Sequence, residues 1–155
     1  FFFSSRRRHT RYIGDWSSDV CSSDLKGRIS LPARFRAAFD EGAYLTLGQD
    51  GCLFAFPRAE WERRSREVRD LPLSDTSGRA YARMIFGKAE EVDLDGQGRL
   101  LIPQRLRTEA GIDKEAVIVG VLDRMEIWDR ATYERYEQTF AAAYRDGSLR
   151  PGESR

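Results

Sequence analysis

The chain has 155 residues, of which 33% are charged, and its 26 Lys and Arg residues against 25 Asp and Glu residues give a net charge of +1. This length suits one compact unit, or two small halves that share a core. The sequence contains no run of about 18 apolar residues, which argues against a membrane partner, and its near-neutral charge by itself neither favours nor excludes nucleic acid.

Residues 1–25 differ from the rest of the chain. They show no helical or strand period and look like a translated sequencing adapter. We therefore expect this segment to be a non-native artefact without order. The authentic protein would then begin at about Lys26, with its own N-terminus and its first strand lost.

Excluding residues 1–25 also removes groups that catalysis and metal binding need. Four Arg and three Asp lie in that segment, so 22 basic and 22 acidic residues remain. His9 lies there too, and Cys52 is left as the single cysteine. A chain with one thiol and no histidine cannot form an internal disulfide, and it lacks common metal ligands and catalytic bases. We expect a cytoplasmic protein that is not an enzyme and that uses no cofactor or metal.

The first part of the remaining chain alternates short strands with helices. Prolines stand where two helices would begin, a position at which the missing N–H costs nothing, and Gly51 marks a hairpin turn. In chain order we expect a strand over 28–31, a helix over 32–39, hairpin strands over 44–47 and 52–56, a helix over 57–69, a linker over 70–78 and a helix over 79–86.

The second part repeats this order and is more complete. Asp129 is suited to cap its last helix, and we interpret the aromatic stripe of that helix as core or subunit interface rather than as a platform for bases. The stripe consists of Tyr133, Tyr136, Phe140 and Tyr144. In chain order we expect strands over 91–94 and 99–102, a helix over 103–111, hairpin strands over 116–121 and 125–128, and a helix from 130 to about 144.

A ten-residue motif occurs twice. Gly27–Arg36 and Gly98–Arg107 both read G-R-apolar-x-apolar-P-x-R-apolar-R, at an offset of 71 residues. The hairpins match as well, with Cys52–Ala55 aligned on Met125–Trp128. The chain is therefore a two-copy repeat, and a repeat constrains the fold more than any single element does.

The duplication predicts two interlocked halves, because a unit of about 50 residues cannot bury a sizeable core alone. The expected class is α+β, mainly β, with two halves related by a pseudo-two-fold axis in one small β-barrel and short helices packed outside. The halves would cover 26–75 and 76–147, and the tail at 148–155 would be flexible.

Each copy of the motif carries three arginines. They are Arg28, Arg34 and Arg36 in the first copy, and Arg99, Arg105 and Arg107 in the second. Helical residues two apart point to different sides, so at most one helix arginine of each copy can join the strand arginine on a common face. Two such patches would place positive charge over the phosphates of a duplex, despite the neutral total. Surface ion pairs are the simpler interpretation of any single arginine, but the repetition favours function.

Asp95 and Arg99 enclose the second turn with the spacing D-x-x-x-R. A carboxylate at this place can accept hydrogen bonds from turn amides and fix the arginine fork. Asp24 and Arg28 keep the same spacing. Because Asp24 lies in the segment that we exclude, we treat this second match as accidental.

Neighbouring carboxylates offer a competing interpretation. Asp93 with Asp95, or Glu90 with Glu91, would suit a Mg²⁺ site or acid–base catalysis. We give this interpretation less weight, because solvated carboxylates are common in strands and turns. The sequence also contains no Gly-rich phosphate loop of the P-loop or Rossmann form.

Two copies of the motif, the D-G-Q-G-R turn at Asp95–Arg99 and an aromatic-led helix after each hairpin resemble the MraZ family, over Lys26 to about Tyr144. The resemblance implies two AbrB-like swapped-hairpin halves in a double β-barrel. It further implies a transcriptional regulator of a division and cell-wall gene cluster, associated with the nucleoid as a ring-like homo-oligomer. Its partner would be double-stranded DNA with short direct repeats in a promoter.

The resemblance also implies which residues contact DNA. Arg99 and Arg28 take the place of the family's D-x-x-x-R arginines, and Asp95 supports the first of them. The nearby basic residues of the family would be Arg34, Arg36, Arg105 and Arg107.

Three other functions fit parts of the sequence. The first is an oligomeric protein-interaction module that holds an acidic partner on its arginine face and does not bind DNA. The second is a small hydrolase or transferase that uses the paired Asp residues. The third is an antitoxin-type AbrB relative, against which the internal duplication argues.

Overall fold

The computed structural model describes residues 18–22, 24 and 26–152. The strands are β1 (Ser18–Ser22), β2 (Arg28–Ser30), β3 (Ala43–Leu47), β4 (Leu53–Pro57), β5 (Glu90–Val92), β6 (Arg99–Leu101), β7 (Glu115–Val121) and β8 (Arg124–Asp129). The helices are α1 (Ala33–Arg36) with the 3-10 turn η1 (Ala37–Phe39), α2 (Arg58–Arg69), α3 (Thr76–Phe86), α4 (Gln104–Glu109) and α5 (Arg130–Arg145). Across these ranges, no helix combines the length and the apolar character that crossing a membrane requires.

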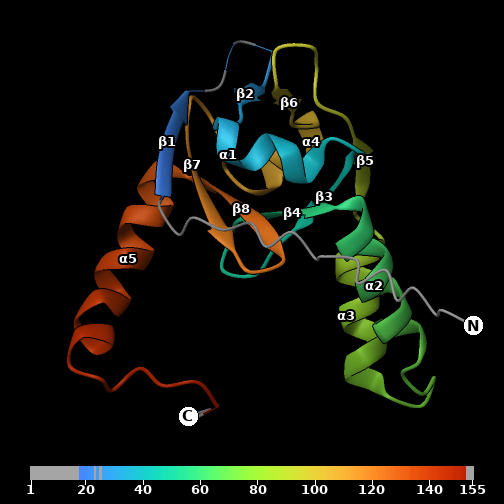
Figure 1. Ribbon diagram of the computed structural model, residues 1–155. Helices are drawn as coiled ribbons and strands as arrows, with labels where there is room; N and C mark the ends of the chain where they lie inside the picture. The colour runs from blue at the N-terminus through green and yellow to red at the C-terminus, as the bar shows by residue number, and fades with distance from the viewer. Residues whose placement is uncertain (1–17, 23, 25, 153–155) are drawn as a thin grey trace, which may run out of the picture.

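The strands form two antiparallel sheets (Figure 1). One sheet has six strands in the order β1-β7-β8-β4-β3-β5, and the other is the two-stranded ribbon β2–β6. The predicted α+β class is confirmed. The helices are not all short, since α5 spans 16 residues, close to the helix expected from 130 to about 144. No pairing among the described strands joins β1 to β5, so the closed barrel is not seen.

Most strand pairings join the two copies of the repeat. β1 pairs with β7, β3 with β5, β4 with β8 and β2 with β6. Among the described strands, pairing within one copy is confined to the hairpins β3–β4 and β7–β8. Each copy thus completes its sheet with strands of the other, which agrees with the expectation that a single copy cannot form a core.

Strand β1 departs from the sequence analysis, which expects no strand before Lys26. Its five residues pair with β7, from Ser18 opposite Val119 to Ser22 opposite Glu115, and Cys21 packs against the main core. This pairing satisfies backbone groups that would otherwise leave β7 as an open edge. The rest of the segment treated as an artefact, residues 1–17 with 23 and 25, lies outside the described residues.

The main core lies between the ribbon, the large sheet and the helices α1 and α4. Ile29 and Leu100, in the middle of the two ribbon strands, are fully buried. Phe35 and Phe39 enter the core together, as their four-residue spacing predicts, and Leu106 of α4 does the same from the second copy. The apolar positions of the repeated motif are therefore core positions.

The burial pattern corrects the alignment of the hairpins by one residue. Leu53–Phe56 alternates buried, half-buried, buried, buried, and Met125–Trp128 does the same. The sequence alignment instead placed Cys52 on Met125. Because side chains in a strand alternate between faces, a shift of one residue exchanges the buried and exposed sets, and only burial in the folded chain fixes the register.

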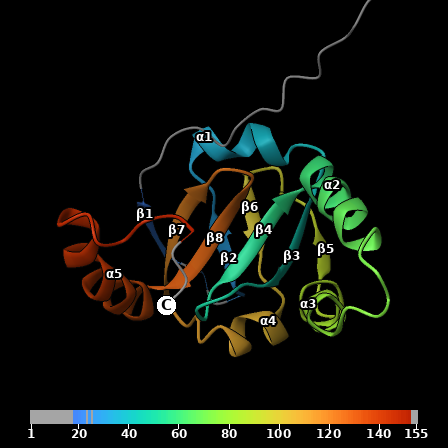
Figure 2. The same ribbon diagram turned by 90° about the horizontal axis from the view of Figure 1, so that it is seen from below.

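The long helices lie at opposite ends of the sheet, with α5 at one end and α2 with α3 at the other (Figures 1 and 2). Trp61 anchors α2: its ring stacks on Tyr44 of β3 at 5.0 Å between centroids and lies 4.7 Å from Phe86 of α3. At the other end, Trp128 of β8 holds the start of α5 through Tyr133 and Tyr136, at 5.7 and 4.9 Å.

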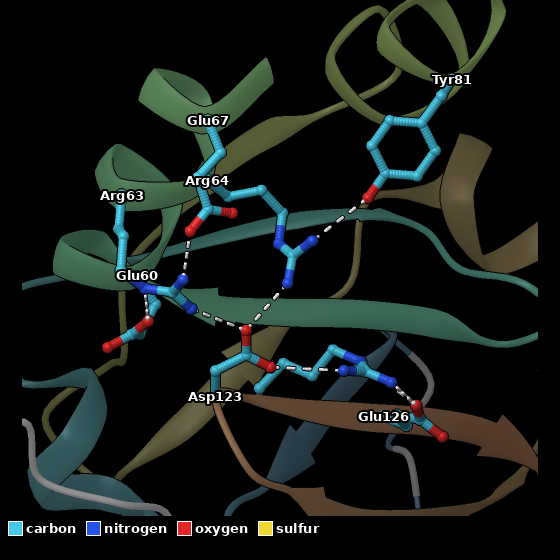
Figure 3. A network of polar contacts seen from close by, with 8 residues as sticks. Glu60, Arg63, Arg64, Glu67, Tyr81, Asp123 and Glu126 are labelled. Carbon is cyan, nitrogen blue, oxygen red and sulfur yellow. Dashed lines mark hydrogen bonds and ion pairs between the residues drawn. The ribbon is translucent and has the colours of Figure 1, made fainter. Parts of the chain in front are cut away.

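A carboxylate in the β7–β8 turn ties α2 to the second hairpin (Figure 3). Asp123 accepts hydrogen bonds from Arg63 at 3.0 Å and from Arg64 at 2.9 Å, both residues of α2. The Arg64 guanidinium also donates to the Tyr81 hydroxyl of α3 at 3.4 Å and lies over the Phe56 ring. One partly buried carboxylate thereby links elements of both copies by charge-assisted bonds.

Candidate nucleic-acid interface

The ribbon β2–β6 brings the two copies of the motif together. Arg28 lies opposite Leu101, Ile29 opposite Leu100 and Ser30 opposite Arg99. The repeat makes Arg28, Ile29 and Ser30 equivalent to Arg99, Leu100 and Leu101. The pairing is therefore symmetric about its central pair, and a pseudo-two-fold axis passes between Ile29 and Leu100. Because the strands are antiparallel, the turns that precede β2 and β6 lie at opposite ends of the ribbon, and both are on the same side of the molecule (Figure 1).

In the second copy, Asp95 holds the turn and its arginine together. Its Oδ1 accepts from the backbone N–H of Gln97 and of Arg99, both at 2.9 Å, and its Oδ2 accepts from Arg99 Nε at 2.7 Å. The backbone closes the same turn, since Gly98 N–H donates to the Asp95 carbonyl at 2.9 Å. The D-x-x-x-R spacing thus forms the turn that the sequence analysis describes.

The first copy makes the same set of bonds, so treating Asp24 as an accidental match is wrong as a description of the fold. Asp24 Oδ1 accepts from the N–H of Lys26 at 2.9 Å and of Arg28 at 3.0 Å, and Oδ2 accepts from Arg28 Nε at 2.7 Å. The spacing alone suffices, because a carboxylate four residues before the arginine reaches the turn amides that it encloses.

The helix arginines Arg36 and Arg107 cross between the copies. A Cβ added to Gly98 would lie 2.5 Å from Arg36 Nε, and one added to Gly27 would lie 2.5 Å from Arg107 Nη1. Each of these side chains therefore covers the turn of the other copy. The sequence analysis expected at most one helix arginine to join the strand arginine of its own copy, whereas Arg36 and Arg107 each lie at the turn of the other copy.

Arg34 and Arg105 have other partners. Arg34 forms an ion pair with Asp19 of β1, and its guanidinium lies 4.8 Å from the centroid of its neighbour Phe35. Arg105 donates to the Lys88 carbonyl at 3.0 Å and lies 3.8 Å from Glu90. Neither contact places them beside the ribbon face that carries Arg28 and Arg99.

The bonding of Arg28 and Arg99 leaves part of each guanidinium available. Within the described part of the chain, their guanidinium bonds are made by Nε, to Asp24 and Asp95. About a third of each side chain is exposed, 33% for Arg28 and 27% for Arg99. A guanidinium held at Nε presents its two Nη groups as an oriented fork, which suits a phosphate or the O6/N7 edge of guanine.

The other carboxylates near the motif lie beside residues of the first copy. Glu91 forms an ion pair with Arg58, and Asp93 lies near Gly42, where an added Cβ would lie 2.9 Å from its Oδ1. Across the described ranges, no group of three or more His, Cys, Asp or Glu side chains is arranged to hold a metal ion.

Two residues of the ribbon face escaped the sequence analysis. Ser30 and Leu101 are exposed on the same side as Arg28 and Arg99, since the alternate residues Ile29 and Leu100 point into the core. The strand period within the motif was the available signal, because residues two apart in a strand share a face.

Comparisons with known proteins agree on one family. The sequence model described as "MraZ protein, putative antitoxin-like" matches residues 18–84 and again 85–148. A protein of Acetivibrio thermocellus named transcriptional regulator MraZ is 45% identical over 125 residues, covering 81% of this chain and 85% of the relative. A protein of the same name from Heliobacterium modesticaldum is 40% identical over 135 residues, covering 87% and 92%.

Replacing Gly98 with alanine should destabilise the fold by about 1–3 kcal/mol, because its φ of +71° suits glycine and the new Cβ would collide with Arg36. Gly96→Ala is the matched control, since an added Cβ in the same turn meets nothing within 4 Å. Urea unfolding measures both variants. Equal stability of the two would refute the close approach of Arg36. Adding Arg36→Ala to Gly98→Ala should recover the steric part of the loss.

The turn should weaken in acid. Hydrogen bonds from the Arg99 N–H and side chain lower the pKa of Asp95 below its ordinary 3.8, and Arg28 does the same for Asp24. A lowered pKa in the folded state means that the stabilisation is complete above about pH 4 and is lost as the pH falls through the lowered value.

Asp95→Asn tests this pH dependence, because asparagine has the shape of the protonated carboxyl. We expect the variant to be less stable than the parent chain at pH 7, and the difference in unfolding free energy to shrink below pH 4. A difference that stays constant down to pH 2.5 would count against the bonding described here.

Proposed function

Since this chain belongs to the MraZ family, we propose that it is a transcriptional regulator that binds double-stranded DNA through the paired D-x-x-x-R turns. The observation that carries the proposal is the identical bonding of Arg28 and Arg99 at the two turns that flank the ribbon. Two oriented forks related by a pseudo-two-fold axis match the repeating phosphates and base edges of a duplex.

The helix arginines would act beside these forks. Arg36 and Arg107 pack against the turns of the opposite copy, so they add positive charge close to Arg99 and Arg28 respectively. Arg34 and Arg105 lie further out, against Asp19 and Glu90. We assign base or phosphate contact first to Arg28 and Arg99, and phosphate contact to Arg36 and Arg107. Asp95 and Asp24 hold the forks in place.

The finer predictions from the sequence belong to this proposal. They are regulation of a promoter with direct repeats, a division and cell-wall gene cluster as the target, a cytoplasmic place on the nucleoid, two barrel-like halves at 26–75 and 76–147, and a protein without catalytic activity. A ring that contacts several repeats would raise a weak single-subunit affinity through effective concentration.

Assembly into a ring is supported by apolar surface at both ends of the molecule. On α5, which has no buried residue, Phe140 is 38% exposed and Tyr144 74%. At the opposite end, a groove of about 350 Å³ lies between α2 and α3, lined by apolar residues such as Val68 and Leu73. A contact between two different surfaces of neighbouring subunits generates rings when the rotation closes.

Substituting Arg28 and Arg99 tests DNA binding. The full chain would be titrated onto fluorescent duplexes of its own upstream DNA, at two salt concentrations and with random competitor. We expect Arg28→Ala with Arg99→Ala to lose about 1–3 kcal/mol for each arginine that reads a base, or to lower the salt slope by about 0.9 for each lost phosphate contact. Arg130→Ala, an exposed arginine of α5, should bind like the parent chain.

Each contrary outcome has a distinct meaning. Unchanged binding by the double variant would place the interface elsewhere. A folded, oligomeric chain that fails to shift DNA even at low salt would instead favour the protein-interaction module.

Placing a charge on the stripe of α5 tests the assembly. Phe140→Glu with Tyr144→Glu should leave the fold intact, because neither residue is buried, and should reduce the mass measured by light scattering to that of a smaller species. Gln138→Glu, on the opposite side of the same helix, should not change the mass. An unchanged mass in the double variant would exclude α5 from the subunit contact.

A further inference from the structure

The two strands of the ribbon present different side chains on its outer face. It carries Arg28 and Ser30 from β2 and Arg99 and Leu101 from β6, while Ile29 and Leu100 point inward with no exposed surface. The offset of the repeat makes Ser30 and Leu101 equivalent positions. One is a small hydroxyl and the other an apolar side chain that is 50% exposed.

The strand register determines whether Ser30 and Leu101 lie beside Arg28 or beside Arg99. Backbone hydrogen bonds join Leu31 N–H to the Gly98 carbonyl and Ile102 N–H to the Gly27 carbonyl, both at 3.0 Å. By the alternation of antiparallel ladders, the pairs Arg28–Leu101 and Ser30–Arg99 are non-hydrogen-bonded pairs, whose side chains lie closest. Leu101 therefore stands beside the Arg28 fork, and Ser30 beside the Arg99 fork.

Ser30 and Leu101 can act in recognition only if the chain binds DNA as proposed above. We propose that Leu101 is a specificity-determining residue, which contacts the C5-methyl group of a thymine in the major groove next to the base pair that Arg28 reads. Ser30 places a hydroxyl at the equivalent point beside Arg99. The ribbon then reads an unsymmetrical sequence, although its backbone has a pseudo-two-fold axis.

The dimensions of the ribbon and the groove agree with this placement. The major groove is about 12 Å wide and admits a two-stranded ribbon. Directly opposite residues of such a ribbon have Cβ atoms about 4.5–5.5 Å apart, which lies between one and two steps of about 3.4 Å between successive base pairs. An arginine and its cross-strand neighbour can therefore reach adjacent base pairs.

The chemistry selects thymine among the bases. The major-groove edge of thymine carries a methyl group beside the O4 acceptor, whereas guanine, adenine and cytosine present polar edges there. A leucine offers no hydrogen bond, so it would leave a polar edge unpaired, while against a methyl group it removes apolar surface from water.

Thymine-to-deoxyuridine substitution tests the contact, because it deletes the methyl group and keeps the base pairing. The probes are duplexes cut to the smallest upstream fragment that the full chain binds, with one thymine replaced in each. At one thymine we expect the parent chain to bind about fourfold more weakly, the effect of one buried methyl group. Leu101→Ser should bind both duplexes alike, and Leu101→Met should keep the discrimination.

Ser30→Leu supplies the reciprocal test. It should gain a similar discrimination at a second thymine, on the other side of the pseudo-two-fold axis. Both positions are exposed, and circular dichroism would check that each variant folds as the parent does.

Three outcomes overturn the inference. Binding that is indifferent to the methyl group at every thymine excludes the contact, and undiminished discrimination in Leu101→Ser assigns it to another residue. In both cases salt-sensitive binding that depends on Arg28 would leave the proposed function standing. A parent chain that binds none of the duplexes would refute both.

Discussion

The antiparallel pairing of β2 with β6 is the contact on which the other features depend. It joins residues about 70 positions apart, with Ile29 opposite Leu100, buries these two residues at the centre of the core, and places one Asp–Arg turn at each end of the ribbon. Neither strand pairs with another of the described strands, although Leu100 of β6 also forms a single bridge with Leu94. Because the pairing requires both copies, the arginine surface exists only in the completed fold, and core packing and candidate site are formed by the same ten residues of each copy.

The arginines that we propose to bind DNA also contribute to packing. Arg36 donates through Nε to the Leu31 carbonyl at 2.8 Å while it covers Gly98, so its geometry is fixed before any ligand arrives. Arg28 and Arg99 are fixed in the same way by carboxylates. Preorganised forks lose less conformational entropy on binding than free surface arginines would. The simple interpretation as surface ion pairs and the functional one are therefore compatible at these positions.

The sequence predicted what is local or repeated. The prolines before α1 and α4, the four-residue spacing of Phe35 and Phe39, and the D-x-x-x-R turn are each set by near neighbours, and each is found in the structure. The exchange of strands was expected only in outline, because no local signal tells β1 to pair with β7. Composition also misled: the unusual character of residues 1–25 hid β1 and Asp24. The contact of Arg36 with the turn of the other copy could not be predicted either, because it depends on the long-range pairing of β2 with β6.

The two copies interlock as two subunits of a dimer do, yet α2, α3 and the residues between them keep both copies on one chain. Their association is therefore an intramolecular, first-order step. Its equilibrium does not shift on dilution, as that of a two-chain assembly would. Covalent linkage has a second consequence. In a dimer of identical chains, a substitution at one site of the symmetric interface appears at both, whereas here positions 30 and 101 are free to change one at a time.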